Sequence, residues 1–274
     1  MKPLDIINEV EAAKAFSRQS QVFDEYDAGN TIIHYKRGRV REHALRYMPA
    51  RGAILELNAG TGEDAAFFAR QGYRVHATDI AMGMQQQLRE KMQRLGLTER
   101  VTTELCSYNS LELLREKGPF DLVFSNFAGL NCTSSLDKVL GSLSPLVKPG
   151  GQVTLVILPR VCLWELMLVF RGKFRTALRR LGTTVRGAKS HVEGVYFRCW
   201  YYSPSYVRRH MPADFELLGL EGLCTIVPPS YIEHFAEKRP GLYAWLRRLE
   251  DRWKSAWPWR AVGDYYIISF RKKG

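Results

Sequence analysis

The sequence contains no apolar run of about 18 residues, which is the length that a membrane-spanning helix needs. Its first residues, MKPLDIINEVEAAK, are acidic and amphipathic and contain no apolar signal core. Its five cysteines are scattered without CxxC spacing, which argues against a zinc site and against a disulfide framework. We therefore expect a cytoplasmic protein with no integral membrane segment and no bound metal.

Positive charge, in contrast, is abundant. The 274 residues include 40 Lys and Arg against 28 Asp and Glu, a formal net charge of +12. Between residues 160 and 262 there are 18 basic and 9 acidic residues, so most of the excess lies in this region. A basic surface suits phosphate, anionic lipid or nucleic acid, and it is equally compatible with a solvated face that binds nothing.

The most informative stretch is AILELNAGTGED, residues 53–64. It predicts a buried strand that enters a tight turn and then a helix that begins at Glu63. Gly60 and Gly62 allow positive φ in that turn and a close approach of a ligand to the backbone. A second strand, RVHATDI, ends in an acid at Asp79. Strand, glycine turn, helix, strand and acid together are typical of half of a nucleotide-binding, doubly wound sheet.

Two features of the turn distinguish between cofactors. A dinucleotide site needs a third glycine, which is absent here, and Glu56 would repel a pyrophosphate. An acid at this position suits a cationic ligand instead. The stretch resembles motif I of class I S-adenosylmethionine-dependent methyltransferases, (E/D)xGxGxG, except that Asn58 replaces the first glycine. Asn tolerates left-handed φ better than most residues, so the turn is expected to survive.

The resemblance implies S-adenosylmethionine as the cofactor, with Asp79 on its ribose. After the third strand, Ser107 and Tyr108 would lie near the adenine. The strand FDLVFSN, residues 120–126, resembles motif IV, which passes beneath the methionine part. The full set of cofactor-binding candidates is Glu56, Asn58, Ala59, Gly60, Gly62, Asp79, Ile80, Ser107, Tyr108, Asn126 and Phe127.

The resemblance also implies an α/β fold with a seven-stranded, mostly parallel, doubly wound sheet whose last strand is antiparallel. We expect an N-terminal helical cap over residues 1–50 and a cofactor-binding core over 51–158. Residues 159–262 would form a substrate lid that includes strand six, and residues 263–274 would add the last strand. Insertions after the fifth strand overhang the substrate in this fold.

The acceptor is less well defined. The aromatic segment HVEGVYFRCWYY, residues 191–202, and a Trp-rich tail suggest walls for a small aromatic or lipid-like acceptor that is anionic. The candidate substrate contacts are Tyr26, Tyr35, Asn131, Glu193, Tyr196 and Trp200. Two alternatives stay open here, because both tyrosines suit helix packing and Asn131 also suits a helix cap.

We favour O-methylation, with His191 as the candidate general base because an unperturbed histidine titrates near working pH. A carboxylate acceptor would need no base. Nucleic acid is disfavoured as acceptor because the chain has neither the (D/N)PPY motif nor a Pro-Cys pair. The alternatives are an RNA- or membrane-binding module on a catalytically silent fold, and a methyltransferase acting on RNA or protein. Peripheral membrane contact and the oligomeric state are left open.

Overall fold

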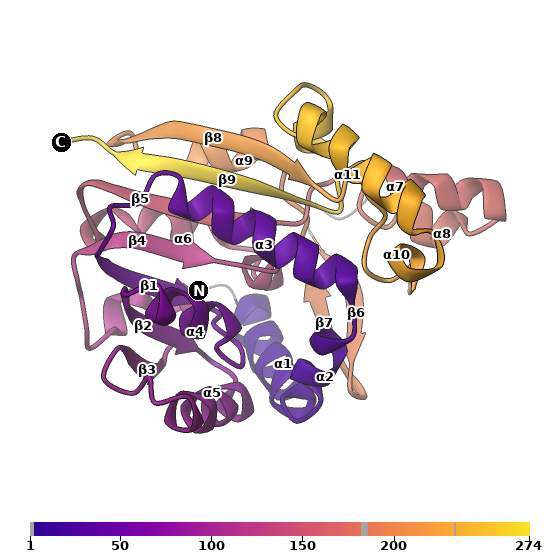
Figure 1. Ribbon diagram of the computed structural model, residues 1–274. Coiled ribbons are helices and arrows are strands. Elements are labelled where there is room, and N and C mark those ends of the chain that lie inside the picture. The colour runs from indigo at the N-terminus through magenta and orange to yellow at the C-terminus, as the bar shows by residue number, and fades with distance from the viewer. Residues whose placement is uncertain (1–2, 182–185, 233) are drawn as a thin grey trace.

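The computed structural model describes residues 3–181, 186–232 and 234–274, and its centre is a single seven-stranded sheet (Figure 1). The strand order is β3-β2-β1-β4-β5-β9-β8. Strands β1 to β5 are parallel, and β9 runs antiparallel to both β5 and β8. The strands are β1 Ala53–Leu57, β2 Arg74–Asp79, β3 Val101–Leu105, β4 Phe120–Ser125, β5 Val147–Ile157, β8 Phe215–Leu223 and β9 Tyr265–Lys272. The expected α/β fold with an antiparallel last strand is confirmed.

Alternating side chains of β1 face two different apolar layers, as the two-residue period of a strand requires. Leu55 and Leu57 pack into one core cluster, and Ile54 packs into the other. The Ile54 layer is covered by α3 (Thr31–Leu45), α4 (Glu63–Arg70) and α5 (Met82–Arg94). The opposite layer is covered by α6 (Leu136–Gly141) and α9 (Pro204–His210).

Of the three N-terminal helices, the first two lie beside the carboxyl ends of the parallel strands, and the third starts there and runs along one face of the sheet (Figure 1). They are α1 (Pro3–Gln19), α2 (Phe23–Ala28) and α3, whose N-cap Asn30 accepts hydrogen bonds from the N–H groups of Ile32 and Ile33. Helix α1 packs on a hairpin of β6 (Ala188–Val192) and β7 (Val195–Cys199), where the rings of Phe16 and Phe197 lie 5.5 Å apart. This aromatic contact holds the carboxyl-terminal part of α1 close to the turn that follows β1.

A helical arm projects from the sheet after β5 (Figure 1). It covers residues 163–181 and contains α7 (Leu163–Leu166), a 3₁₀ turn (Met167–Arg171) and α8 (Phe174–Ala177). The sequence predicts one helix over residues 162–170, but the chain changes to 3₁₀ geometry at Met167 and turns at Gly172, where φ is 70°. Helices α10 (Phe235–Lys238) and α11 (Pro240–Trp253) pack against the first half of α3.

Buried ion pairs attach the arm to the sheet. The guanidinium of Arg180 donates to Glu165 at 2.6 Å and to the Asp264 carboxylate at 3.1 Å. Cys162, Glu165 and Asp264 are close enough together to hold a cation, but this guanidinium already pairs with both carboxylates. The arm is therefore fixed to the beginning of β9.

Candidate active site

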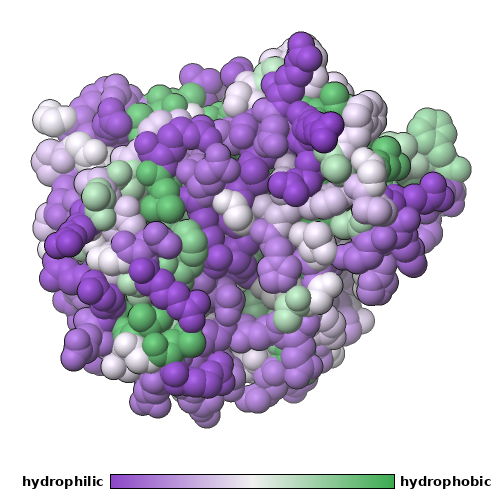
Figure 2. All heavy atoms as spheres, viewed as in Figure 1, coloured by the Kyte–Doolittle hydropathy of each residue, from purple (hydrophilic) through white to green (hydrophobic). Residues whose placement is uncertain are grey.

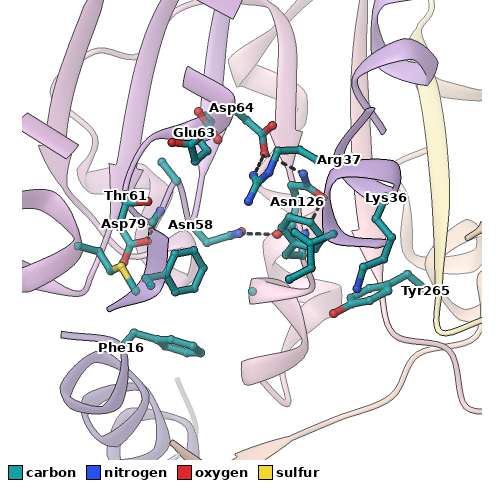
Figure 3. A pocket seen from close by; sticks show the side chains of 18 of the residues that line it. Phe16, Lys36, Arg37, Asn58, Thr61, Glu63, Asp64, Asp79, Asn126 and Tyr265 are labelled. Atoms are coloured by element: carbon teal, nitrogen blue, oxygen red, sulfur yellow. Dashed lines mark hydrogen bonds and ion pairs between the residues drawn. The ribbon is translucent and has the colours of Figure 1, made fainter. Parts of the chain in front are cut away.

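A cavity of about 290 Å³ opens at the carboxyl ends of β1, β2 and β4, which is where ligands bind in open α/β sheets (Figure 3). Its floor is the turn between β1 and α4. Its walls come from α1, α3, the loop after β4 and the first residue of β9. Figure 3 shows Asp79 at one end of the cavity and Lys36 with Tyr265 at the other.

The glycine turn takes left-handed backbone at three positions, with φ of 47° at Asn58, 57° at Gly60 and 82° at Gly62. A Cβ on Gly60 would have no atom within 4 Å, so this backbone is open to the cavity. Asn58 thus adopts the left-handed geometry expected of it.

The Asn58 side chain connects two loops. Its Nδ2 donates to the carbonyl of Asn126 at 2.9 Å, and its Oδ1 accepts from the Ser125 hydroxyl at 2.6 Å. A Cβ built on Gly129 would lie only 2.4 Å from Asn58 Cγ, so Gly129 leaves the space that this amide fills. A glycine at position 58 could not make these contacts.

Asp79 fastens the turn to the end of β2. Its carboxylate accepts from the N–H of Gly60 at 2.9 Å and from the N–H of Ala81 at 2.8 Å. Burial raises the pKa of Asp79, while these backbone donors act in the opposite direction. Each carboxylate oxygen has two lone pairs, so the group still has capacity to accept from a ligand hydroxyl.

Glu56 is a buried carboxyl group in the cavity that has, within the described part of the chain, an unsatisfied hydrogen-bond acceptor. It is 2% exposed, and its Oε2 has no hydrogen-bond partner among the described residues. Burial, with a further contribution from Asp64, raises its pKa well above the usual value. A buried carboxyl of this kind gains from a cationic donor, because a charge in a dry site is costly unless it is paired. The amino group of S-adenosylmethionine meets that need, so the site fits the cofactor that the sequence implies.

Asp64 organises the wall beside Glu56. It accepts from Arg37 at 2.8 Å, from Arg41 at 2.6 Å and from the Asn126 side-chain amide at 2.7 Å. Burial alone would raise its pKa, but the two guanidinium groups hold the pKa below the usual value. The cluster orients the loop after β4. The sequence did not identify Arg37 as a cavity residue, because α3 has no clear apolar face.

The opposite end of the cavity combines two aromatic rings with one ammonium group, which also pairs with the Asp264 carboxylate at 3.7 Å. Lys36 Nζ lies 5.4 Å from the ring centre of Phe127 and 4.8 Å from that of Tyr265, and it donates to the Ser230 hydroxyl at 2.8 Å. Phe127 has φ of 48°, a strained value for a bulky residue that often accompanies a functional position. Burial raises the pKa of Tyr265 to about 12, so its phenol stays protonated at neutral pH. The sequence identified neither Lys36 nor Tyr265.

The structure brings most of the predicted cofactor residues to this cavity but leaves some outside it. Those that line it are Glu56, Asn58, Ala59, Gly60, Asp79, Asn126 and Phe127. Gly62, Ile80, Ser107 and Tyr108 do not. The Ser107 hydroxyl donates to Glu9, and the Tyr108 hydroxyl donates to the carbonyl of Gly129 at 3.1 Å. Contact of these four with a cofactor stays a prediction.

None of the candidate substrate residues lines the main cavity. Tyr35, Asn131 and Trp200 are buried, and Asn131 ties the end of β5 to β7 through the carbonyls of Leu158 and Trp200 rather than capping a helix. Tyr26 is exposed and lines a neighbouring cavity that shares Ile33 and Ser230 with the main one.

The candidate general base, His191, lies on the hairpin together with two of the candidate substrate contacts, Glu193 and Tyr196. His191 and Glu193 are exposed at its edge, and Tyr196 is 67% exposed with its ring centre 4.5 Å from that of His191. The structure therefore gives His191 no contact with the cavity.

Comparison with known proteins gives a consistent result. Residues 54–151 match the methyltransferase domain family. Demethylmenaquinone methyltransferase of Thermobifida fusca is 31% identical over 137 residues, which are 49% of this chain and 56% of that protein. A ubiquinone/menaquinone biosynthesis C-methyltransferase of Hydrogenovibrio crunogenus is 29% identical over 164 residues, 56% of this chain and 63% of that protein. The matches thus span little more than half of these relatives.

Among solved structures, the 1,6-didemethyltoxoflavin-N1-methyltransferase of Burkholderia thailandensis, with bound 1,6-didemethyltoxoflavin and S-adenosylhomocysteine, has the same fold. The TM-score is 0.56 at 16% identity, and the match covers 97% of this chain and 88% of that one.

Proposed function

Because the chain belongs to the class I S-adenosylmethionine-dependent methyltransferases, we propose that it methylates a small hydroxylated aromatic or quinol-like acceptor that binds as an anion. The observation that carries the acceptor class is the Lys36 ammonium above the rings of Phe127 and Tyr265. Two ring faces suit a flat apolar molecule, and the ammonium suits a negative oxygen on it.

The cofactor end of the cavity has the groups that this reaction needs. When bound, S-adenosylmethionine supplies an electrophilic methyl group on its sulfonium. In this proposal Glu56 binds the amino group of the cofactor, and Asp79 accepts from its ribose. The open backbone at Gly60 allows the cofactor to approach the turn. Asp64 and Asn126 fix the wall between the two ends.

Ionisation of the acceptor needs no general base in this proposal, because the Lys36 ammonium stabilises the anion and the phenol proton passes to solvent. None of the described histidines lines the cavity, and the high pKa of the Tyr265 phenol makes it a donor and not a base at neutral pH. A nearby ammonium lowers the pKa of an acceptor phenol, because an opposite charge favours the ionised form. The cavity then aligns this anion with the methyl group, and such alignment is a large part of the catalysis of a methyl transfer.

A phenolate can be methylated on oxygen or on the adjacent ring carbon. The O-methylation expected from the sequence remains a proposal, and the relative from Hydrogenovibrio crunogenus is named a C-methyltransferase. The ion pair to Lys36 supports both routes, since the same anion is the nucleophile. The two products are isomers of equal mass, so an NMR spectrum of the product separates them, because only an O-methyl product has lost a free hydroxyl.

The test is transfer of a labelled methyl group to a panel of hydroquinones and hydroxylated aromatic acids, compared between the wild-type protein and Lys36→Met. We expect kcat/KM for the acceptor to fall by about 10²-fold or more in the variant, with unchanged cofactor affinity. Arg89→Met, which removes a basic residue from α5 outside the cavity, is the matched control. Equal turnover by the Lys36 variant would contradict the acceptor site. No transfer to any acceptor, with steep salt-sensitive RNA binding instead, would favour the silent-module alternative.

A further inference from the structure

The arm over residues 163–181 exposes its apolar side chains instead of burying them. Phe170 is 89% exposed, Phe174 58% and Met167 55%, and Leu178 and Leu181 are also exposed. An exposed cluster of this kind commonly marks an interaction surface. Figure 2 shows apolar atoms at the far end of the arm, beside strongly hydrophilic ones.

The hydrophilic atoms carry one sign of charge. Arg171, Lys173 and Arg175 alternate with the aromatic residues and are exposed. From residue 166 to residue 192 the sequence has seven Lys or Arg and no Asp or Glu. Arg179 and Arg180 are paired with Glu165 at the base of the arm, so the positive charge without an acidic partner among the described residues lies towards its end.

The local geometry presents these residues together. The 3₁₀ turn ends at Gly172, whose left-handed φ of 70° reverses the chain into α8. Phe170 and Phe174 therefore flank a tight turn, and basic residues separate them. Figure 1 shows that this turn lies at the outer limit of the molecule, away from the sheet. Nothing in the part of the chain that the structure describes covers these rings.

We propose that this arm docks the protein on an anionic lipid bilayer, with Phe170 and Phe174 in the interface and the basic residues on the headgroups. Aromatic and aliphatic side chains beside Lys and Arg are the combination that binds such interfaces, because apolar burial and attraction to anionic lipid add. No helix among the described residues is long and apolar enough to cross a bilayer, so this contact is peripheral.

The base of the arm lies beside the acceptor end of the cavity. Arg180 binds Asp264, and Asp264 lies 3.7 Å from Lys36 and directly precedes Tyr265. Docking through the arm therefore attaches the protein to the membrane by the same side of the sheet that holds the acceptor end, and an apolar acceptor would partition into that membrane. This last step rests on the proposed function, whereas the docking itself does not.

The experiment is co-sedimentation of the full chain with vesicles of phosphatidylcholine, with and without phosphatidylglycerol, in the absence of cofactor and acceptor. We expect binding that requires the anionic lipid and weakens at high salt. The double variant Phe170→Ala/Phe174→Ala should bind at least about tenfold more weakly, because the lost apolar area is what inserts. Leu113→Ala is the matched control, since Leu113 is 70% exposed and lies on a 3₁₀ helix (Tyr108–Leu113) that is not part of the arm.

Several outcomes would overturn the inference. The first is the absence of vesicle binding by the wild type, and the second is an equally large loss of vesicle binding in the Leu113→Ala control. The third is light scattering that shows a dimer for the wild type and a monomer for the double variant. Preferential binding of single-stranded RNA through Arg171, Lys173 and Arg175 would also overturn it. An unchanged thermal midpoint in the double variant shows that the fold is intact. Loss of vesicle binding with normal methyl transfer to a water-soluble acceptor would separate this inference from the proposed function.

Discussion

Replacing Glu56 by Gln should weaken cofactor binding and at the same time stabilise the ligand-free protein. Glu56 is buried, and its Oε2 lacks a partner among the described residues. An ammonium ligand would supply that partner, and a hydrogen bond between charged groups contributes about 1.5–3 kcal/mol. The variant should therefore bind S-adenosylmethionine about ten- to 150-fold more weakly.

The stability effect has a definite sign. Burial, with Asp64 beside it, raises the pKa of Glu56 in the folded protein above its unfolded value. Stability from this group is therefore full below the unfolded pKa and is lost as pH rises towards the folded pKa. Above about pH 4.5 the free energy of unfolding of the wild type should fall relative to Glu56→Gln by at most about 1.4 kcal/mol per pH unit. Each kcal/mol corresponds to about 2–4 °C in the thermal midpoint for a chain of roughly this size.

Calorimetry in phosphate and in Tris provides the assay, because the two buffers differ in their enthalpy of ionisation. If the ligand's ammonium group ionises Glu56, the wild type releases a proton on binding and Glu56→Gln does not. The matched control is Glu90→Gln, which makes the same change on the exposed side of α5. Wild-type affinity in the Glu56 variant, or identical proton release, would refute the reasoning.

Three further changes test other parts of the site. Asp79→Asn removes an acceptor for Gly60 or Ala81 and for the ribose, so calorimetry should show about ten- to 150-fold weaker cofactor binding, and an unchanged affinity would contradict it. Gly129→Ala should reduce the free energy of unfolding measured in urea by about 1–3 kcal/mol, because the added methyl group would clash with the Asn58 side chain. Adding Asn58→Gly should restore part of the lost stability, and a double variant in which the two losses simply add would contradict this contact. His191→Ala should retain turnover within a few-fold, because His191 lies exposed on the hairpin; a fall of about 10²–10⁴-fold would restore it as a general base.

The parts of the site that the sequence predicted depend on local signals. Residues 53–64 combine an apolar run, small turn residues and first-turn acids, and these identify the strand, turn and helix without any long-range information. Asn58 replaced a glycine, yet its tolerance of left-handed φ was enough to predict the turn. Asp79 could be predicted as a site residue because it is the acid that ends the next strand.

Lys36, Arg37 and Tyr265 could not be predicted in the same way. Lys36 and Arg37 lie on a helix that buries polar and apolar residues alike, so its periodicity gives no inward face. Tyr265 begins a strand more than 200 residues later in the sequence, and the antiparallel pairing of β9 with β5 and β8 brings it to the cavity. Contacts between such distant elements are set by the packing of the whole sheet.

The outward orientation of His191 could have been predicted from the alternation of buried and exposed residues along the two hairpin strands. Along β6 the exposed residues are Lys189 and His191, and along β7 Val195 and Phe197 are buried while Tyr196 is exposed. His191 pairs with Tyr196 across the hairpin, so both side chains lie on its outer face. The apolar partners inside the hairpin, rather than its polar residues, face α1.

The most direct test of the account is calorimetric titration of the wild-type chain with S-adenosylhomocysteine, S-adenosylmethionine and NAD. We expect one site that binds both sulfur compounds, releases protons on binding, and is weakened by Glu56→Gln and by Asp79→Asn. Preferential binding of NAD, or no binding of either sulfur compound, would contradict the assignment of this cavity.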